Sequence, residues 1–276
     1  MLRIFEKVIQ MKMFLFIIFI LSFALPVGAG INTQEIEYSV GETMMKGYLA
    51  YDDSISKKRP GVLVVHEWWG HNEHSRTRAR MLAAMGYTAL AVDMYGGGKT
   101  TDHPKKAAEL MNTAFKNWKA TKARFEKAFK TLKSHKTVNP NHIASIGYCF
   151  GGAVSLRMAR SGLNLNGVAA FHSALPLEPK ISKGGVKAAI MIANGSEDIF
   201  LKPQTVATFT SEMILAGVDM TYINLKGIKH SYTNPQADEF SKKYNIENLA
   251  YNKTADRRTW IALQRFFNRI FASQLN

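Results

Sequence analysis

The sequence has very little cysteine, a clear minority of acidic residues and no apolar run of transmembrane length. A single cysteine, Cys149, stands among 276 residues, so a disulfide within the chain is excluded. The eight histidines include no pair four residues apart, and with one cysteine this argues against a metal site. The glycine-rich segment 95–101 lacks the spacing of a phosphate-binding loop. We therefore expect neither a metal nor a cofactor.

Positive charge greatly exceeds negative charge. The chain has 36 Lys and Arg residues against 21 Asp and Glu residues, a net charge of +15. Such a charge attracts anionic polymers and surfaces over long distances. No nucleic-acid-binding motif accompanies it, so no nucleic-acid partner is expected. The remaining interpretation is an electrostatic association with the anionic surface of a cell envelope.

The N-terminus carries the longest apolar stretch. Basic residues occur within segment 1–12, residues 13–25 are almost wholly apolar, and small residues lead up to Ala29. This order is typical of a signal peptide, and cleavage after Ala29 would leave residues 30–276 as a single domain. The stretch is shorter than the roughly 20 residues that span a bilayer. We expect an exported protein, periplasmic or secreted, with a membrane anchor by an uncleaved signal as the alternative.

Cys149 lies in a pattern that suits a nucleophile. Residues 147–152 read G-x-C-x-G-G, after an apolar segment and before a helix-like run. This predicts a nucleophile elbow, a strand, a sharp turn and a helix, with sulfur in place of a serine hydroxyl. The alternative is a small buried hydrophobic residue. A free thiol outside the cytosol is a liability unless it is buried or used, which favours the chemical role.

Two further residues fall where a hydrolase of this type needs them. Asp198 follows the apolar run 188–193, and His230 follows the run 220–225. The order Cys, Asp, His is the nucleophile, acid, base order of α/β-hydrolases, and sites of open α/β sheets lie at the carboxyl ends of the strands. The alternatives are a loop carboxylate for Asp198 and a surface histidine for His230. His66, His71 and His74 share one loop and are expected to be solvated.

Apolar runs and helix-like runs alternate along the chain. This predicts a mostly parallel central sheet with helices on both faces, the α/β-hydrolase fold. A hairpin at 35–40 and 44–51 precedes the alternation, and a long terminal helix over about 246–272 ends it. The expected strands are 62–65, 88–92, 143–146, 168–171, 188–193 and 220–225, and the expected helices include 74–85, 105–115, 118–133, 153–160 and 204–216.

From about Gln34 to the C-terminus, the chain resembles the dienelactone hydrolase family. The resemblance rests on residues 62–70, 93–96, 147–152, 195–198 and 230–235. It implies an enzyme with Cys149 as nucleophile, His230 as base and Asp198 as the acid that orients the histidine. It also implies that Glu67 contacts the resting thiol and is displaced when substrate binds, with a helix-capping role for Glu67 as the alternative.

The chemistry of acyl transfer adds the oxyanion donors. A tetrahedral intermediate needs two backbone N–H groups, and the expected donors are Phe150, the residue after the nucleophile, and Trp68 in the first strand-to-helix loop.

The chain departs from the family pattern at the substrate. Hydrolases of dienelactone itself place an arginine four residues after the catalytic histidine, where this chain has Asn234. Lysine cannot reproduce the two-pronged grip of arginine on a carboxylate, so dienelactone is not the expected substrate. Trp69, Tyr95 and Tyr148 join Asn234 as candidates for the substrate pocket, with ordinary core packing as the alternative for Trp69 and Tyr148.

Two functions from different classes follow. The first is a hydrolase that cleaves small esters or lactones through an acyl-thioenzyme. The second is a non-catalytic, envelope-associated binding protein on the same fold, with a relict triad. The oligomeric state is left open.

Overall fold

A computed structural model describes residues 30–272 and is built around one large sheet. The sheet has eight strands in the order β1-β2-β4-β3-β5-β6-β7-β8. The hairpin of β1 (Ile31–Val40) and β2 (Thr43–Asp52) is antiparallel and forms one edge. β2 also pairs antiparallel with β4, and the remaining neighbours, from β4 to β8 in this order, run parallel. The predicted mostly parallel sheet is therefore confirmed.

The parallel strands are buried because both faces of the sheet are covered. β3 (Arg59–Val65), β4 (Thr88–Val92) and β6 (Gly167–Phe171) are buried at every position, as expected for strands that read as continuous apolar runs. The remaining strands are β5 (Val138–Tyr148), β7 (Ala189–Gly195) and the edge strand β8 (Met220–Leu225).

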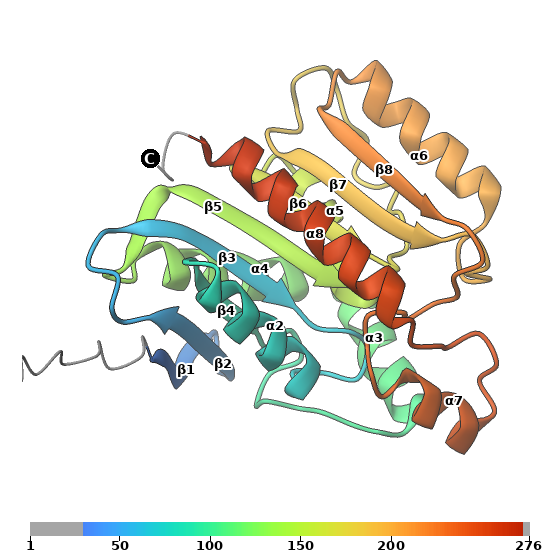
Figure 1. Ribbon diagram of the computed structural model, residues 1–276, viewed down its shortest axis with the longest axis horizontal. Coiled ribbons are helices and arrows are strands. Elements are labelled where there is room, and N and C mark those ends of the chain that lie inside the picture. Colours follow the sequence, from blue (N-terminus) through green and yellow to red (C-terminus); the bar gives the residue numbers. More distant parts are fainter. Residues whose placement is uncertain (1–29, 273–276) are drawn as a thin grey trace, which may run out of the picture. The chain divides into compact units, whose positions relative to one another are not determined.

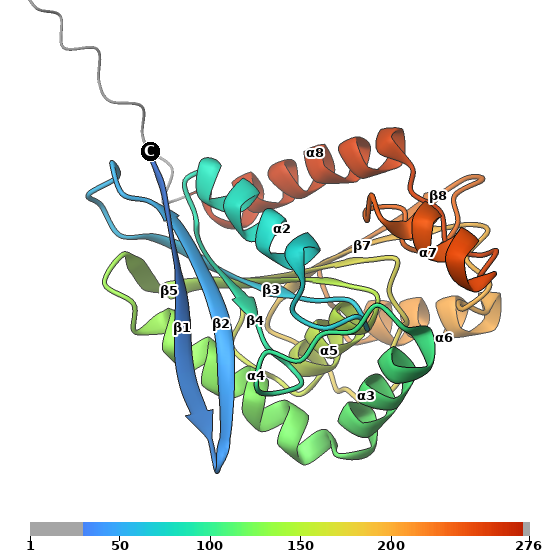
Figure 2. The same cartoon turned by 90° about the horizontal axis from the view of Figure 1, so that it is seen from below.

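Helices form a layer on each face, as Figures 1 and 2 show. One layer contains α2 (Glu73–Ala84) and α8 (Lys253–Ile270). The opposite layer contains α4 (Trp118–Lys133), α5 (Phe150–Arg160) and α6 (Pro203–Leu215). Two separate apolar clusters fill the spaces between the sheet and these layers. The helices α3 (Pro104–Lys116) and α7 (Ala237–Tyr244) lie near the carboxyl ends of the strands.

The terminal helix differs from the prediction. The segment 246–272 is not one helix, because α8 begins at Lys253 and α7 precedes it. Asn245 ends α7 in the left-handed conformation, with φ of 53°, and the Asn252 side chain caps α8 by accepting a hydrogen bond from the Ala255 N–H. The connection 245–252 is therefore a loop, and it reaches the site described below.

The predicted signal peptide, residues 1–29, lies outside the described residues. Within residues 30–272, no helix is both long and apolar enough to span a membrane.

Candidate active site

Cys149 occupies a sharp turn between β5 and α5. Its φ of 51° and ψ of −115° are unusual for a residue with a side chain. Such backbone strain is maintained only where the surrounding structure fixes it, and it is common at functional sites. The Cys149 N–H donates to the Phe171 carbonyl at 3.0 Å. The thiol lies at the N-terminus of α5, where the helix dipole favours negative charge.

The glycines of the elbow are required by close contacts. A Cβ at position 147 would lie 2.2 Å from the Gly151 carbonyl oxygen, and a Cβ at position 151 would lie 2.3 Å from the Val65 carbonyl oxygen. Strand, turn and helix therefore pack closely only without these side chains. The structure therefore has the strand, sharp turn and helix that the motif predicts.

His230 and Asp198 meet Cys149 at the carboxyl ends of the strands. The His230 Nδ1–H donates to Asp198 Oδ2 at 2.6 Å, and both side chains are almost fully buried. The imidazole lines the same cavity as Cys149 and lies close enough for the sulfur to act on its pKa. Burial alone would lower the pKa of His230, but the sulfur and the Asp198 carboxylate outweigh it and raise this pKa to about 10. The three predicted residues therefore lie together in a Cys-His-Asp arrangement.

The histidines expected to be solvated are buried instead. His66, His71 and His74 are 0%, 2% and 7% exposed. Burial lowers the pKa of His66, and it lowers those of His71 and His74 to about 3. His66 and His71 lie in the loop after β3, whereas His74 lies in the first turn of α2.

The Trp68 segment is held by hydrogen bonds to its carbonyl groups. The His66 Nδ1–H donates to the Glu67 carbonyl at 2.5 Å, and the Tyr95 hydroxyl donates to the Trp68 carbonyl at 3.0 Å. Because a peptide is planar and trans, fixing the Glu67 carbonyl also fixes the direction of the Trp68 N–H. Neither this N–H nor that of Phe150 has an acceptor among residues 30–272. Both amides are available to a ligand.

The Glu67 carboxylate lies elsewhere than the resemblance implies. It is 1% exposed, and its hydrogen-bond donors are Ser231 Oγ, at 3.0 Å, and Asn234 Nδ2. Burial raises the pKa of Glu67, and the two hydrogen bonds oppose this shift. The carboxylate is thus bound to the segment that follows His230 rather than to the thiol.

A cavity of about 240 Å³ lies against Cys149 and His230. Of its ten described lining residues, only these two carry an ionisable group. The others are Trp68, Met111, Phe115, Phe150, Ala153, Ala174, Phe200 and Leu249. The cavity is therefore an apolar chamber with the nucleophile and the imidazole at its polar end.

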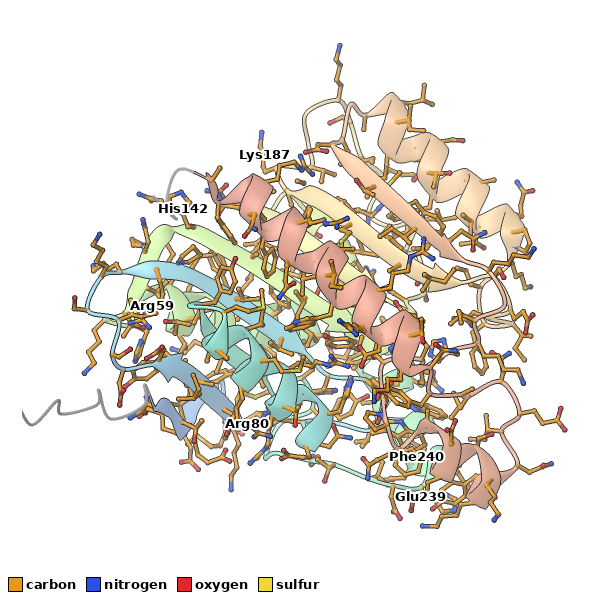
Figure 3. The ribbon with its side chains drawn as sticks, viewed as in Figure 1. Arg59, Arg80, His142, Lys187, Glu239 and Phe240 are labelled. Atoms are coloured by element: carbon orange, nitrogen blue, oxygen red, sulfur yellow. The ribbon has the colours of Figure 1, made fainter. Side chains whose placement is uncertain are left out.

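The four predicted pocket residues do not line this cavity. Trp69 packs against Phe240 of α7, with ring centroids 4.4 Å apart (Phe240 is labelled in Figure 3). Tyr148 lies on the opposite side of the sheet from the cavity and stacks on Phe171. The Tyr95 hydroxyl donates to the Trp68 carbonyl, and the Asn234 side chain donates to Glu67.

The actual lining residues could be found only in part from the sequence. Phe200 follows Asp198 by two residues, and Ala153 lies on the first turn of the elbow helix, so both were within reach of the motifs. Met111, Phe115 and Leu249 come from α3 and from the loop before α8, which carry no motif.

Among the described residues that line the cavity, the His230 imidazole is the one group that could pair as a cation with a substrate carboxylate. Lys99 and Lys106 line a different cavity beside α3 and α4, and Lys106 pairs with Glu109. Asn234 stands at the position of the arginine in dienelactone hydrolases, and its side-chain amide donates a hydrogen bond to Glu67.

Comparison with known protein families gives a match over most of the chain. The model of the "Dienelactone hydrolase family" matches residues 45–271. The chain belongs to the dienelactone hydrolase family. It is therefore a hydrolase with the α/β-hydrolase fold that acts on ester or lactone bonds, as predicted.

Several individual proteins are similar over most of their length. The solved protein named m3DLH is 33% identical, with a TM-score of 0.82, and the match covers 88% of this chain and 99% of that one. A dienelactone hydrolase-like promiscuous phosphotriesterase from metagenomic libraries is 28% identical, with a TM-score of 0.80, covering 87% and 98%. Protein usf of Aquifex pyrophilus is 27% identical over 210 residues, 75% of this chain and 89% of that protein.

Proposed function

We propose that the protein hydrolyses uncharged esters or lactones with an apolar acyl group, through Cys149 and an acyl-thioenzyme. The observation that carries the proposal is the Cys-His-Asp arrangement at the end of an apolar cavity. The non-catalytic alternative is disfavoured because a relict site has no reason to keep a strained elbow, a buried ion pair and two free amides around one thiol.

The residues divide the reaction between them. The Cys149 sulfur, as thiolate, attacks the acyl carbon, and the carbonyl electrons move to oxygen. The Phe150 and Trp68 N–H groups stabilise this oxyanion. The intermediate collapses with loss of the alkoxide, which takes a proton from His230. His230 then removes a proton from water as the water attacks the thioester, and collapse releases the acid and restores the thiolate and imidazolium. Asp198 orients the imidazole throughout.

The apolar lining sets the substrate class. A carboxylate moved from water into such surroundings loses its hydration without gaining a partner, which is strongly unfavourable. An alkyl or aryl acyl group gains about 0.8 kcal/mol for each buried methylene. The cavity therefore favours neutral acyl groups and disfavours dienelactone, whose carboxylate needs a cation.

The test is hydrolysis of p-nitrophenyl esters and small lactones by the protein lacking residues 1–29, beside Cys149→Ala and Cys149→Ser. We expect turnover by the wild type that disappears with alanine. Turnover that is indifferent to Cys149, or no turnover of any ester or lactone in the set, would contradict the mechanism.

We also propose that this hydrolase is exported, because residues 1–29 have the organisation of a signal peptide. Cleavage after Ala29 would remove Arg3, Lys7, Lys12 and Glu6 and leave a net charge of +13, which favours association with an anionic envelope surface. N-terminal sequencing of the protein from its native host tests the cleavage: a sequence beginning at Gly30 supports it, and one that retains the apolar stretch supports the anchored form.

A further inference from the structure

The entrance of the cavity beside Cys149 carries two large apolar side chains that are exposed to solvent. Of the ten described lining residues, Ala174 and Phe200 are the two that are exposed. Ala174 follows β6 and Phe200 follows β7, so the cavity opens between the loops at the carboxyl ends of these strands. Ile199 precedes Phe200, and the two residues are 73% and 57% exposed. We call this pair the Ile199–Phe200 tip.

The backbone of the tip is fixed to the site. The Ile199 N–H donates to Asn248 Oδ1 at 3.2 Å, and the Phe200 N–H donates to Asp198 Oδ1 at 3.0 Å. The Phe200 ring lies edge-on to the His230 imidazole, with ring centroids 5.1 Å apart. The loop is therefore held in a conformation that leaves two large apolar side chains in water. Such a patch gains free energy when an apolar partner covers it.

Lysines surround the tip. Lys202 lies two residues beyond Phe200, and Lys226 and Lys229 lie in the loop after β8, which is joined to the loop after β7 by backbone hydrogen bonds. The exposed carboxylates of these loops and of the loop 245–252 are Glu197 and Glu247. Positive charge is thus in excess at the tip, as it is in the whole chain, whose net charge is +15. An apolar centre with cations around it suits a lipid surface with anionic headgroups.

A second exposed apolar pair lies at the far end of α6. Ile214 and Leu215 are 68% and 81% exposed. They lie about 18 Å along the helix from Pro203, because α6 runs back from the carboxyl ends of the strands (Figure 1). Neither residue lines the cavity beside Cys149. This pair has a similar exposure to the tip but no connection with the cavity, so it provides a matched control.

The place of the tip at the entrance indicates what covers it. A lipid surface can cover the tip and the entrance together, so that a lipophilic ester passes from the lipid into the cavity without first dissolving in water. We propose that Ile199 and Phe200 insert into an anionic lipid surface, with the lysines on its headgroups and the cavity open towards the lipid. The substrates are then lipophilic esters that partition into that surface. This inference rests on the proposed function only in assigning the cavity to the acyl group.

The test is co-sedimentation with vesicles of equal parts phosphatidylglycerol and phosphatidylcholine. It uses the protein lacking residues 1–29, so that the apolar N-terminus does not itself bind lipid; the sheet and both helix layers remain. We expect Ile199→Asp to weaken binding at least about tenfold, because it removes a buried apolar side chain and adds a repelled carboxylate. Ile214→Asp should bind as the wild type does. Neither residue lines the cavity, so both variants should hydrolyse dissolved p-nitrophenyl acetate at the wild-type rate.

Two further measurements test the charge and the delivery of substrate. Vesicles of phosphatidylcholine alone, or the double variant Lys202→Gln with Lys226→Gln on the mixed vesicles, should each weaken binding at least about tenfold. p-Nitrophenyl hexanoate carried in the mixed vesicles should be hydrolysed more slowly by Ile199→Asp than by Ile214→Asp.

The proposal is overturned if Ile199→Asp binds the mixed vesicles as well as the wild type, if Ile214→Asp loses as much binding, or if phosphatidylcholine alone binds equally well. A wild-type dimer in size-exclusion chromatography that Ile199→Asp dissociates would also overturn it, because a second copy of the chain would then cover the tip. Circular dichroism shows which variants are folded, and Ile199→Ser serves if Ile199→Asp is not. Vesicle binding needs no ester turnover, so a failure of the proposed hydrolysis would be seen separately.

Discussion

The apolar cavity beside Cys149 makes a quantitative prediction about acyl chain length. Each methylene that enters the cavity is worth about 0.8 kcal/mol, which is roughly fourfold in kcat/KM. Acetyl and butanoyl esters differ by two methylenes, so the butanoyl ester should react about fifteenfold faster by the same measure. An acyl group that ends in a carboxylate should lose at least about a hundredfold against its neutral analogue of equal length, because the lining offers it no partner.

A larger side chain in the lining should narrow the cavity and so change the range of acyl groups that react. Ala174 lines it, so Ala174→Leu should reduce turnover of hexanoyl esters while leaving acetyl esters almost unchanged. Ala207→Leu, on the exposed side of α6, is the matched control and should leave the chain-length profile as it is. The assay is kcat/KM for a series of p-nitrophenyl esters. A flat profile from acetyl to hexanoyl, or a narrowing effect from Ala207→Leu as large as that from Ala174→Leu, would refute the assignment of this cavity to the acyl group.

Three further predictions concern the elbow, the triad and the buried histidines. Gly151→Ala should destabilise the fold by more than about 3 kcal/mol, because its Cβ would lie 2.3 Å from the Val65 carbonyl oxygen; urea unfolding measures this, and a stability equal to the wild type would contradict the packing of the elbow. Asp198→Asn removes a carboxylate that helps raise the pKa of His230 to about 10, so the alkaline limb of the pH–rate profile should move to lower pH, and an unmoved limb would show that it does not come from this imidazole. Burial lowers the pKa of His71 to about 3, and neither of its ring nitrogens has a hydrogen-bond partner among residues 30–272. Protonation of His71 therefore favours the unfolded chain, so the free energy of unfolding is at its full value above the unfolded pKa of about 6.5 and falls as the pH drops towards 3, by about 2 kcal/mol at pH 5. His71→Leu should reduce the loss of unfolding free energy between pH 7 and pH 5 by that amount, whereas the exposed control His103→Gln should leave it unchanged.

The sequence alone predicts that Cys149, Asp198 and His230 lie together because each of them is adjacent to a recognisable sequence feature. Cys149 has its glycines, and Asp198 and His230 each follow a short apolar run that the structure confirms as a strand. Strands buried on both faces are read easily, since burial makes them continuous in apolar residues. The family of the chain followed from the same few segments.

The substrate cavity was not predictable in the same way. Whether Met111 or Trp69 faces the nucleophile depends on how α3 and α7 pack, and no short motif records that packing. The prediction of one terminal helix over 246–272 is wrong because an apolar stripe at helical spacing does not fix where the helix begins. Asn252 and the residues after it carried a capping signal, which would have separated the loop from α8 and drawn attention to Leu249.

The loop 245–252 brings Leu249 to the cavity and pairs with the His230 backbone on its way, through the His230 N–H to the Asn248 carbonyl and the Ala250 N–H to the His230 carbonyl. One surface connection thus supplies both a wall of the cavity and two hydrogen bonds that hold the His230 backbone. A change of side chain at position 249 can alter which acyl groups fit, whereas an insertion or deletion nearby would disturb the imidazole as well. We therefore expect substitutions in this loop to change which acyl groups fit the cavity, whereas the length of the loop is constrained.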